Sequence, residues 1–267
     1  VEWMKTSIEN RIKTIRQIQH AIEQHKERLS RAISLENGKP LWESSKEVLG
    51  IISKVDVTLE AYESRCAANY HPLGVSTNQT YYKPHGVCAV IGPFNFPAHL
   101  PFGHIIPALL LGNTIIFKPS EKTPYVAELM MEIINETSLP SDVIQLIQGD
   151  SETAKYLVQH PKVGAVFFTG SYAVGQKIYD QTRTQLGKMV ALELGGNNPL
   201  ILESTDEPET VLSIIIQSAF ITAGQRCSCA RRLIAVDTKQ NRQLIDQLVA
   251  AIPKIRVAAS TTEPEPF

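Results

Sequence analysis

A cysteine beside arginines is the residue in this sequence whose setting points most directly to catalysis. Cys227 lies in the segment Ala223-Gly-Gln-Arg-Cys-Ser-Cys-Ala-Arg-Arg, directly after a Gly-Gln turn. Nearby cations lower the pKa of a thiol and favour the nucleophilic thiolate. We therefore interpret Cys227 as a candidate nucleophile. The other cysteines, Cys66, Cys88 and Cys229, are interpreted as small core residues, the usual role of a free cysteine.

A carboxylate set among apolar residues is a candidate general base. Glu193 lies in Leu192-Glu-Leu-Gly-Gly-Asn-Asn-Pro, where two glycines end an apolar run. Carboxylates are seldom buried without a reason, and burial would raise the affinity of Glu193 for a proton. Such a group suits general base catalysis. A structural glutamate paired with a cation is the alternative that the sequence leaves open.

An amide in a stiff loop could stabilise a developing negative charge. Asn95 lies in Ile91-Gly-Pro-Phe-Asn-Phe-Pro-Ala-His, where one glycine and two prolines restrict the backbone. Its side-chain NH2 could donate a hydrogen bond to an oxyanion. An asparagine that satisfies its own turn is an equal alternative.

Two further segments could hold a dinucleotide. In Phe117-Lys-Pro-Ser-Glu, Lys118 could contact a phosphate or a ribose hydroxyl, and Glu121 could accept hydrogen bonds from ribose hydroxyls. A carboxylate there would repel a 2′-phosphate, which favours NAD over NADP. Gly170 and Ser171 precede a predicted helix, whose N-terminus favours an anion such as pyrophosphate. The GxGxxG and P-loop motifs are absent, and a solvated, capped loop is the alternative for residues 117–124.

These segments need a sheet to position them, and the middle of the chain has the pattern of one. Short apolar runs alternate with helical stretches, which predicts an α/β fold with a parallel sheet covered on both faces. Ligands of such sheets bind beyond the carboxyl ends of the strands, where these motifs fall. The expected strands are Val87–Ile91, Thr114–Phe117, Val143–Ile147, Ala165–Phe168, Met189–Leu192 and Leu200–Leu202, and the expected helices are His104–Leu111, Tyr125–Thr137, Thr153–Gln159 and Val174–Thr184.

The N-terminal region predicts helices that pack on this sheet. Residues 7–35 carry isoleucines and leucines at spacings of three, four or seven, which predicts one long amphipathic helix. Asn37-Gly38 supplies a left-handed stop, and a second helix is expected from Pro40 to Tyr70.

Composition excludes several classes of function. The 267 residues are 43% hydrophobic and 20% charged with a net charge of −1, which is ordinary for a globular protein and gives no basic surface for nucleic acid. Cysteine and histidine lack zinc-ligand spacing, so no metal is expected. No apolar run is long enough for a membrane span and no signal peptide is evident, so we expect a cytoplasmic protein. The proline-rich end suggests a piece of a longer protein.

Together, in this order and spacing, the segments resemble the aldehyde dehydrogenase family over residues 1–267, somewhat more than half of a family chain. The resemblance implies a Rossmann-like sheet, with N-terminal helices and an NAD-binding domain in residues 1–223 and the beginning of a catalytic domain in 224–267. It implies that Cys227 is the nucleophile, that Glu193 is the base, and that Asn95 and the backbone N–H of Cys227 hold the oxyanion. The cofactor contacts it implies are Lys118, Ser120, Glu121, Gly170, Ser171, Gly175 and Gly195.

Within the family, features such as Pro84-His-Gly-Val and Gly103-His-Ile-Ile-Pro-Ala-Leu are most similar to the dehydrogenases that oxidise N-succinylglutamate 5-semialdehyde in bacterial arginine breakdown. That resemblance implies NAD-dependent oxidation of a small aldehyde to an acid through a thiohemiacetal and a thioester, in a homo-oligomeric parent. The substrate's three carboxylates should need cationic contacts, and the candidates are Arg226, Arg231, Arg232, His99 and His104. An inactive nucleotide-binding fragment and a dehydrogenase of another semialdehyde remain alternatives.

Overall fold

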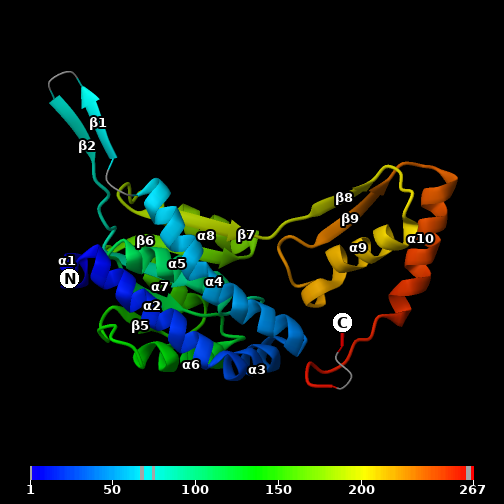
Figure 1. The fold of residues 1–267 in the computed structure, drawn as a ribbon, viewed down its shortest axis with the longest axis horizontal. Helices are drawn as coiled ribbons and strands as arrows, with labels where there is room; N and C mark the ends of the chain where they lie inside the picture. The colour runs from blue at the N-terminus through cyan, green and yellow to red at the C-terminus, as the bar shows by residue number, and fades with distance from the viewer. Residues whose placement is uncertain (1, 67–68, 74–75, 263–265) are drawn as a thin grey trace.

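The computed structural model describes residues 2–66, 69–73, 76–262 and 266–267, which form two lobes and a projecting hairpin (Figure 1). The larger lobe contains a five-stranded sheet between layers of helices. The smaller lobe is formed by the chain after residue 197. Among the described residues, no helix combines the length and apolarity that crossing a bilayer requires.

The sheet of the larger lobe is parallel throughout, which confirms the expected fold class. Its strand order is β5-β4-β3-β6-β7. The chain therefore builds one side outward from β3 and then returns to build the other side from β6. Ligands of such sheets bind where the order reverses, between β3 and β6. The strands are β3 (Val87–Ile91), β4 (Thr114–Lys118), β5 (Ile144–Leu146), β6 (Val163–Gly170) and β7 (Met189–Leu194).

Helices cover both faces of this sheet because its buried strands are apolar on both sides. Along β3, Cys88 and Val90 join the hydrophobic cluster of the N-terminal helices, whereas Ala89 and Ile91 join the cluster on the opposite face. The helices that follow the strands are α5 (His99–Leu110), α6 (Pro124–Asn135), α7 (Ser151–Gln159) and α8 (Tyr172–Thr182). The first two pack on one face and the last two on the other.

The single helix expected over residues 7–35 is wrong, because the chain bends at His25 (φ −100°, ψ 14°). The bend separates α2 (Ile8–Gln24) from α3 (Lys26–Asn37), and both helices keep buried apolar residues facing the core. The apolar spacing continues across the bend, so it gave no sign of the break. The predicted stop at Gly38 is present, with a left-handed φ of 78°. A short α1 (Glu2–Lys5) precedes α2 and buries Trp3, whose indole N–H donates to the carbonyl of Leu109.

The second expected helix is shorter than Pro40–Tyr70. It forms α4 (Leu41–Arg65), and residues 67–68 lie outside the described residues. The prediction is wrong at Asn69 and Tyr70, which belong to β1 (Asn69–Leu73). This strand pairs antiparallel with β2 (Ser76–Thr80) in the projecting hairpin (Figure 1).

The smaller lobe contains a second sheet. The strand expected at 200–202 forms as β8 (Asn198–Leu202), but it pairs with β9 (Ala230–Ala235) rather than with the larger sheet. The helices α9 (Pro208–Phe220) and α10 (Lys239–Ala251) pack on this pair around Leu202, Ile215 and Leu244. A turn with left-handed backbone, Ile221–Gly224, follows α9, and a short 3-10 turn, Ile252–Lys254, follows α10. The domain division at residue 223 stays a prediction.

Candidate active site

A cavity of about 560 Å³ lies where the carboxyl ends of β3, β4, β6 and β7 meet the turn that carries Cys227. It is lined by every residue expected to be catalytic or to bind the cofactor except Gly175. The expected residues that line it are Asn95, Lys118, Ser120, Glu121, Gly170, Ser171, Glu193, Gly195 and Cys227. The structure thus brings together segments that are up to 132 positions apart in sequence, although the chemical role of each residue stays a prediction.

Cys227 is the exposed member of the four free cysteines. Burial raises the pKa of the Cys88 thiol to about 12, and Cys229 is buried with its Sγ 3.8 Å from the carbonyl oxygen of Ile221. Cys66 is half-buried. A thiol must be reachable to attack a substrate, and Cys227 alone among the four lines the cavity.

The backbone around Cys227 is held from the smaller lobe. Asn198 Nδ2 donates to the carbonyl oxygen of Cys227 at 2.6 Å and to that of Cys229 at 3.2 Å. Gly196 permits this close approach, because a Cβ atom there would lie 3.1 Å from the Cys227 oxygen and 3.0 Å from Asn198 Oδ1. Asn198 was not among the expected residues, since nothing in a Gly-Gly-Asn-Asn run shows which backbone group its side chain will bind.

Asn95 is linked directly to the cysteine segment. Its Nδ2 donates to the carbonyl oxygen of Gln225 at 2.6 Å. An amide NH2 has two hydrogens, so this bond occupies one donor. The loop of Asn95 and the turn of Cys227 therefore face each other across one side of the cavity.

The expected burial of Glu193 is wrong, because its side chain is exposed. It lies on β7 opposite Thr169 of β6, and β7 is the edge strand of the sheet. An edge strand has a neighbour on one side only, so its residues are covered less than those of β3 or β4. Glu193 nevertheless lines the same cavity as Cys227.

Lys118 and Glu121 extend the cavity beyond β4. Lys118 is 3% exposed, its Nζ donates to the carbonyl oxygen of Pro119 at 2.7 Å, and its burial lowers the pKa of the ammonium group. Glu121 is exposed, with a carboxylate oxygen 3.9 Å from Lys118 Nζ. The Oγ of Ser120 accepts a hydrogen bond from the backbone N–H of Lys122.

The start of α8 closes the other side of the cavity. Ser171 caps the helix, and its Oγ accepts from the N–H of Val174 at 3.3 Å. Free N–H groups and the helix dipole at such an end favour an anion. Gly175 does not reach the cavity; it packs against Leu194, which a Cβ atom would approach to 2.6 Å.

The five expected cationic contacts divide between the cavity and other places. Arg226 and Arg231 line the cavity, whereas Arg232 donates to the carbonyl oxygen of Asn197 outside it. His99 lies against Gly50, and His104 stacks on Phe167 with ring centroids 5.2 Å apart. Burial lowers the pKa of both histidines, which disfavours their cationic form.

A buried ion pair that the sequence analysis missed supports the Asn95 loop. Lys39 and Glu47 form it with both side chains fully buried. Glu47 Oε1 accepts from the backbone N–H groups of Ala98 and His99 at 3.1 and 3.0 Å, at the start of α5. Lys39 Nζ donates to the carbonyl oxygen of Asn95 at 3.1 Å. Lys39 lies in the connection between α3 and α4, whereas Glu47 lies on α4, and their spacing in the sequence gave no indication of this contact.

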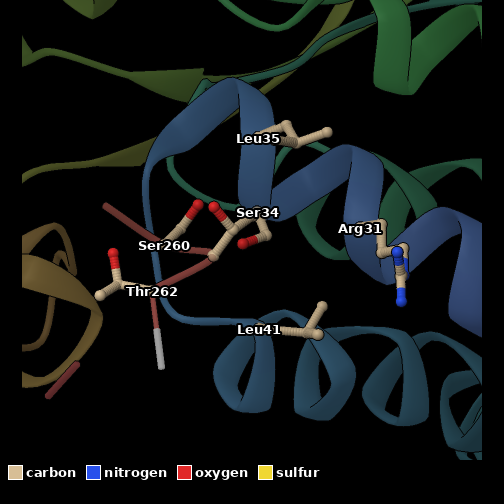
Figure 2. Close-up of a pocket in the computed structure, with 7 residues that line it drawn as sticks. Arg31, Ser34, Leu35, Leu41, Ser260 and Thr262 are labelled. Carbon is tan, nitrogen blue, oxygen red and sulfur yellow. The ribbon is translucent and has the colours of Figure 1, made fainter. Parts of the chain in front are cut away.

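A second cavity of about 200 Å³ lies apart from these residues (Figure 2). It separates α3 and the start of α4 from the C-terminal segment around Ser260. Its lining contains Arg31 and hydroxyl side chains but none of the candidate residues. Among the described residues, no group of His, Cys, Asp and Glu side chains is arranged to hold a metal ion.

Comparison with known proteins agrees with the order of these segments. The model of the aldehyde dehydrogenase family matches residues 1–265. N-succinylglutamate 5-semialdehyde dehydrogenase of Yersinia pseudotuberculosis serotype IB (strain PB1/+) is 43% identical over 265 residues, covering 99% of this chain and 52% of that protein. The chain thus spans about half the length of the curated relatives that it matches.

Solved structures give the same result. Lactaldehyde dehydrogenase from Escherichia coli matches with a TM-score of 0.88 and 31% identity, over 96% of this chain and 54% of that one. An E. coli NADP-dependent enzyme matches with a TM-score of 0.92 and 28% identity, over 100% and 55% of the two chains. The resemblance found in the sequence is confirmed: the chain belongs to the aldehyde dehydrogenase family.

Proposed function

We propose that this chain is part of an NAD-dependent dehydrogenase that oxidises N-succinyl-L-glutamate 5-semialdehyde to N-succinyl-L-glutamate. The observation that carries the proposal is the shared cavity of Cys227, Glu193 and Asn95 at the carboxyl edge of the sheet. The substrate assignment rests on the relative that is 43% identical. The match covers 52% of that relative, so the activity is proposed for the whole protein of which this chain is part.

The residues of the cavity fit a dinucleotide. Its volume lies within the range of small-molecule and cofactor sites. The capped end of α8 offers N–H groups to a pyrophosphate, and buried Lys118 lies across the cavity at the end of β4. Thr169 Oγ1, at the cavity wall, is buried without a hydrogen-bond partner among the described residues. Bound NAD would supply the hydride acceptor.

Each of three residues of this chain has a separate role in the proposed reaction. The Cys227 thiolate attacks the aldehyde carbon, and the free N–H of Asn95 and the backbone N–H of Cys227 stabilise the oxyanion. After oxidation the acyl group is a thioester on Cys227. Glu193 takes a proton from water, which hydrolyses the thioester to the acid. The exposure of Glu193 gives it access to that water.

The preference for NAD rests on Glu121. Its exposed carboxylate at the end of β4 can accept from ribose hydroxyls and would repel a 2′-phosphate. The E. coli relative described as NADP-dependent marks the alternative within the family. We propose NAD for this chain, with a homo-oligomeric parent.

The test is NADH formation by the purified protein with N-succinylglutamate 5-semialdehyde and NAD, followed by mass analysis of Cys227 for the acyl adduct. Cys227→Ala should abolish both signals, whereas Cys229→Ala, two positions away, should retain the adduct. Succinate semialdehyde in place of the substrate tests the choice of aldehyde. Binding of NAD without any adduct on Cys227 would refute the catalytic proposal and favour a nucleotide-binding fragment.

A further inference from the structure

The turn that presents Cys227 has an unusual backbone. Thr222, Ala223 and Gly224 have φ angles of 59°, 52° and 68°, so three successive residues are left-handed. Glycine adopts this region readily, but alanine and especially a β-branched threonine do not. A conformation of this kind persists only where the surrounding structure imposes it.

Glu43, in the first turn of α4, imposes it from the other lobe. Its side chain is 2% exposed, and its Oε1 accepts from Thr222 Oγ1 at 2.8 Å and from Arg226 Nη2 at 3.0 Å. Arg226 Nε in turn donates to Thr222 Oγ1 at 2.6 Å. The three side chains form a closed set of hydrogen bonds around the turn, and we refer to Glu43, Thr222 and Arg226 as the clamp.

The clamp joins the two loops of the cavity. The Arg226 guanidinium lies 5.4 Å from the centroid of the Phe96 ring, next to Asn95 in sequence. Gln225, between Thr222 and Arg226 in the sequence, accepts the hydrogen bond of Asn95 at its backbone carbonyl oxygen. Arg231 Nη2 donates to the carbonyl oxygen of Gly224 at 2.7 Å. The position of Cys227 relative to Asn95 therefore depends on where Arg226 is held.

The clamp also pairs the positive charge of Arg226 with a buried carboxylate. The buried carboxylates of Glu43 and Glu47 lie beside the cations of Arg226 and Lys39, which balances the cluster. Arg226, the residue next to Cys227, is thus paired with the carboxylate of Glu43. The other charged groups that line the cavity of Cys227 are Lys118, Glu121, Lys122, Asp150, Glu193 and Arg231.

We propose that Glu43 is a positioning residue, which acts through Thr222 and Arg226 to fix the turn of Cys227 against the Asn95 loop and to neutralise the arginine cation that adjoins the thiol. This inference rests on the proposed function, because it assigns significance to Cys227. No catalytic step passes through Glu43 itself.

The test is the pH dependence of iodoacetamide alkylation at Cys227, followed by mass spectrometry in the whole protein. Glu43→Gln keeps the shape of the side chain but removes the charge that neutralises Arg226. The midpoint of the alkylation profile should fall by about half a pH unit, a roughly threefold faster reaction below the midpoint. Arg226→Gln should move the midpoint upward, since it removes the cation that adjoins the thiol while Glu43 keeps the hydrogen bond from Thr222 Oγ1.

The double variant Glu43→Gln/Arg226→Gln provides the rescue. Both charges are then absent, so the midpoint should return close to that of the unmodified protein. Glu132→Gln breaks a comparable pair with Arg28 on the exposed surface and should leave the midpoint unchanged. A residue that only supported the fold would lower stability without this pattern of opposite shifts and recovery.

Failure of the clamp proposal can be distinguished from failure of the proposed function. If the midpoint in Glu43→Gln equals that of the unmodified protein, or the double variant does not recover it, the clamp proposal is overturned. If Glu43→Gln fails to fold, Arg226→Gln decides, because the Arg226 side chain is 33% exposed and tolerates replacement; an unmoved midpoint there also overturns it. A Cys227 that never forms an acyl adduct contradicts the proposed function instead, and leaves the midpoint comparison intact.

Discussion

Glu47→Gln should destabilise the larger lobe, because it leaves the buried ammonium group of Lys39 without its carboxylate partner. The replacement keeps an oxygen for the N–H groups of Ala98 and His99 but puts an uncharged amide beside Lys39, whose side chain is fully buried. An unpaired buried ammonium is more costly than a neutral amine, so Lys39 should lose its proton in the folded variant.

The loss of stability can be estimated from the free energy of removing the proton from Lys39. Releasing it at pH 7 from a lysine with an ordinary pKa near 10.4 costs roughly 4.5 kcal/mol, at 1.36 kcal/mol per pH unit. This value is an upper limit, and it agrees with the ~3–5 kcal/mol measured when one partner of a buried pair is removed. The carbonyl of Asn95 and the Phe96 ring, 4.0 Å from Lys39 Nζ, remain as partners and reduce the cost.

The sign of the pH dependence distinguishes this explanation from a simple packing defect. The pKa of an unpaired buried lysine lies below that of the unfolded chain, so the unfolded state binds more protons between the two values. Stability of the variant should therefore rise with pH, by up to about 1.4 kcal/mol per unit, until the pH reaches the pKa of the unfolded chain.

The assay is urea unfolding followed by tryptophan fluorescence, to which Trp3, buried in the larger lobe, and Trp42, on α4 of the same lobe, contribute. The unmodified protein and Glu47→Gln are compared at pH 7 and pH 9.5. Lys39→Met/Glu47→Gln, which also removes the ammonium, should recover most of the lost stability. A stability difference that is the same at both pH values, or a double variant no better than Glu47→Gln, would refute the reasoning.

Three further predictions concern single positions. Gly164→Ala should destabilise by roughly 1–3 kcal/mol in thermal unfolding, because its Cβ would lie 2.1 Å from the carbonyl oxygen of His85, whereas Gly187→Ala meets nothing within 4 Å and should be tolerated; equal melting temperatures would contradict this. Cys88, with its raised pKa and full burial, should resist alkylation at pH 8 until urea unfolds the sheet, and labelling in native buffer would show that it is accessible. Asp150→Ala removes the cap that accepts two N–H groups of α7 and should cost about 1 kcal/mol, seen as a lower urea midpoint, while Asp150→Asn should retain most of it.

The sequence predicted the larger sheet well because strand signals are local. Apolar runs such as Val87–Ile91 must form buried strands wherever they lie, and the loops after them carry the candidate residues. The failures have physical causes that lie outside any short window. Glu193 is exposed because β7 lies at the edge of the sheet, and the apolar residues of a strand do not show its place in the strand order. The strand at 198–202 has the same apolar pattern whichever sheet it joins.

The supporting network was missed for a related reason. Thr222 and Glu43 are 179 positions apart, and Asn95 and Gln225 are 130 apart. A single glutamate in the first turn of a helix is usually a favourable charge at the helix dipole, so Glu43 carried no signal of its own. Side chains that support others across the two lobes can be identified only from the three-dimensional structure.

The cavity draws its thiol from one lobe and its carboxylate from the other, with the chain passing between them after β7 (Figure 1). The spacing of Cys227 and Glu193 consequently depends on the seam between the two lobes, where the hydrogen bonds of Glu43 and Asn95 lie. Warming should loosen that seam before either hydrophobic core melts. The reactivity of Cys227 would then fall at temperatures where the helical content is still intact. A protein that is folded by circular dichroism could therefore already be inactive.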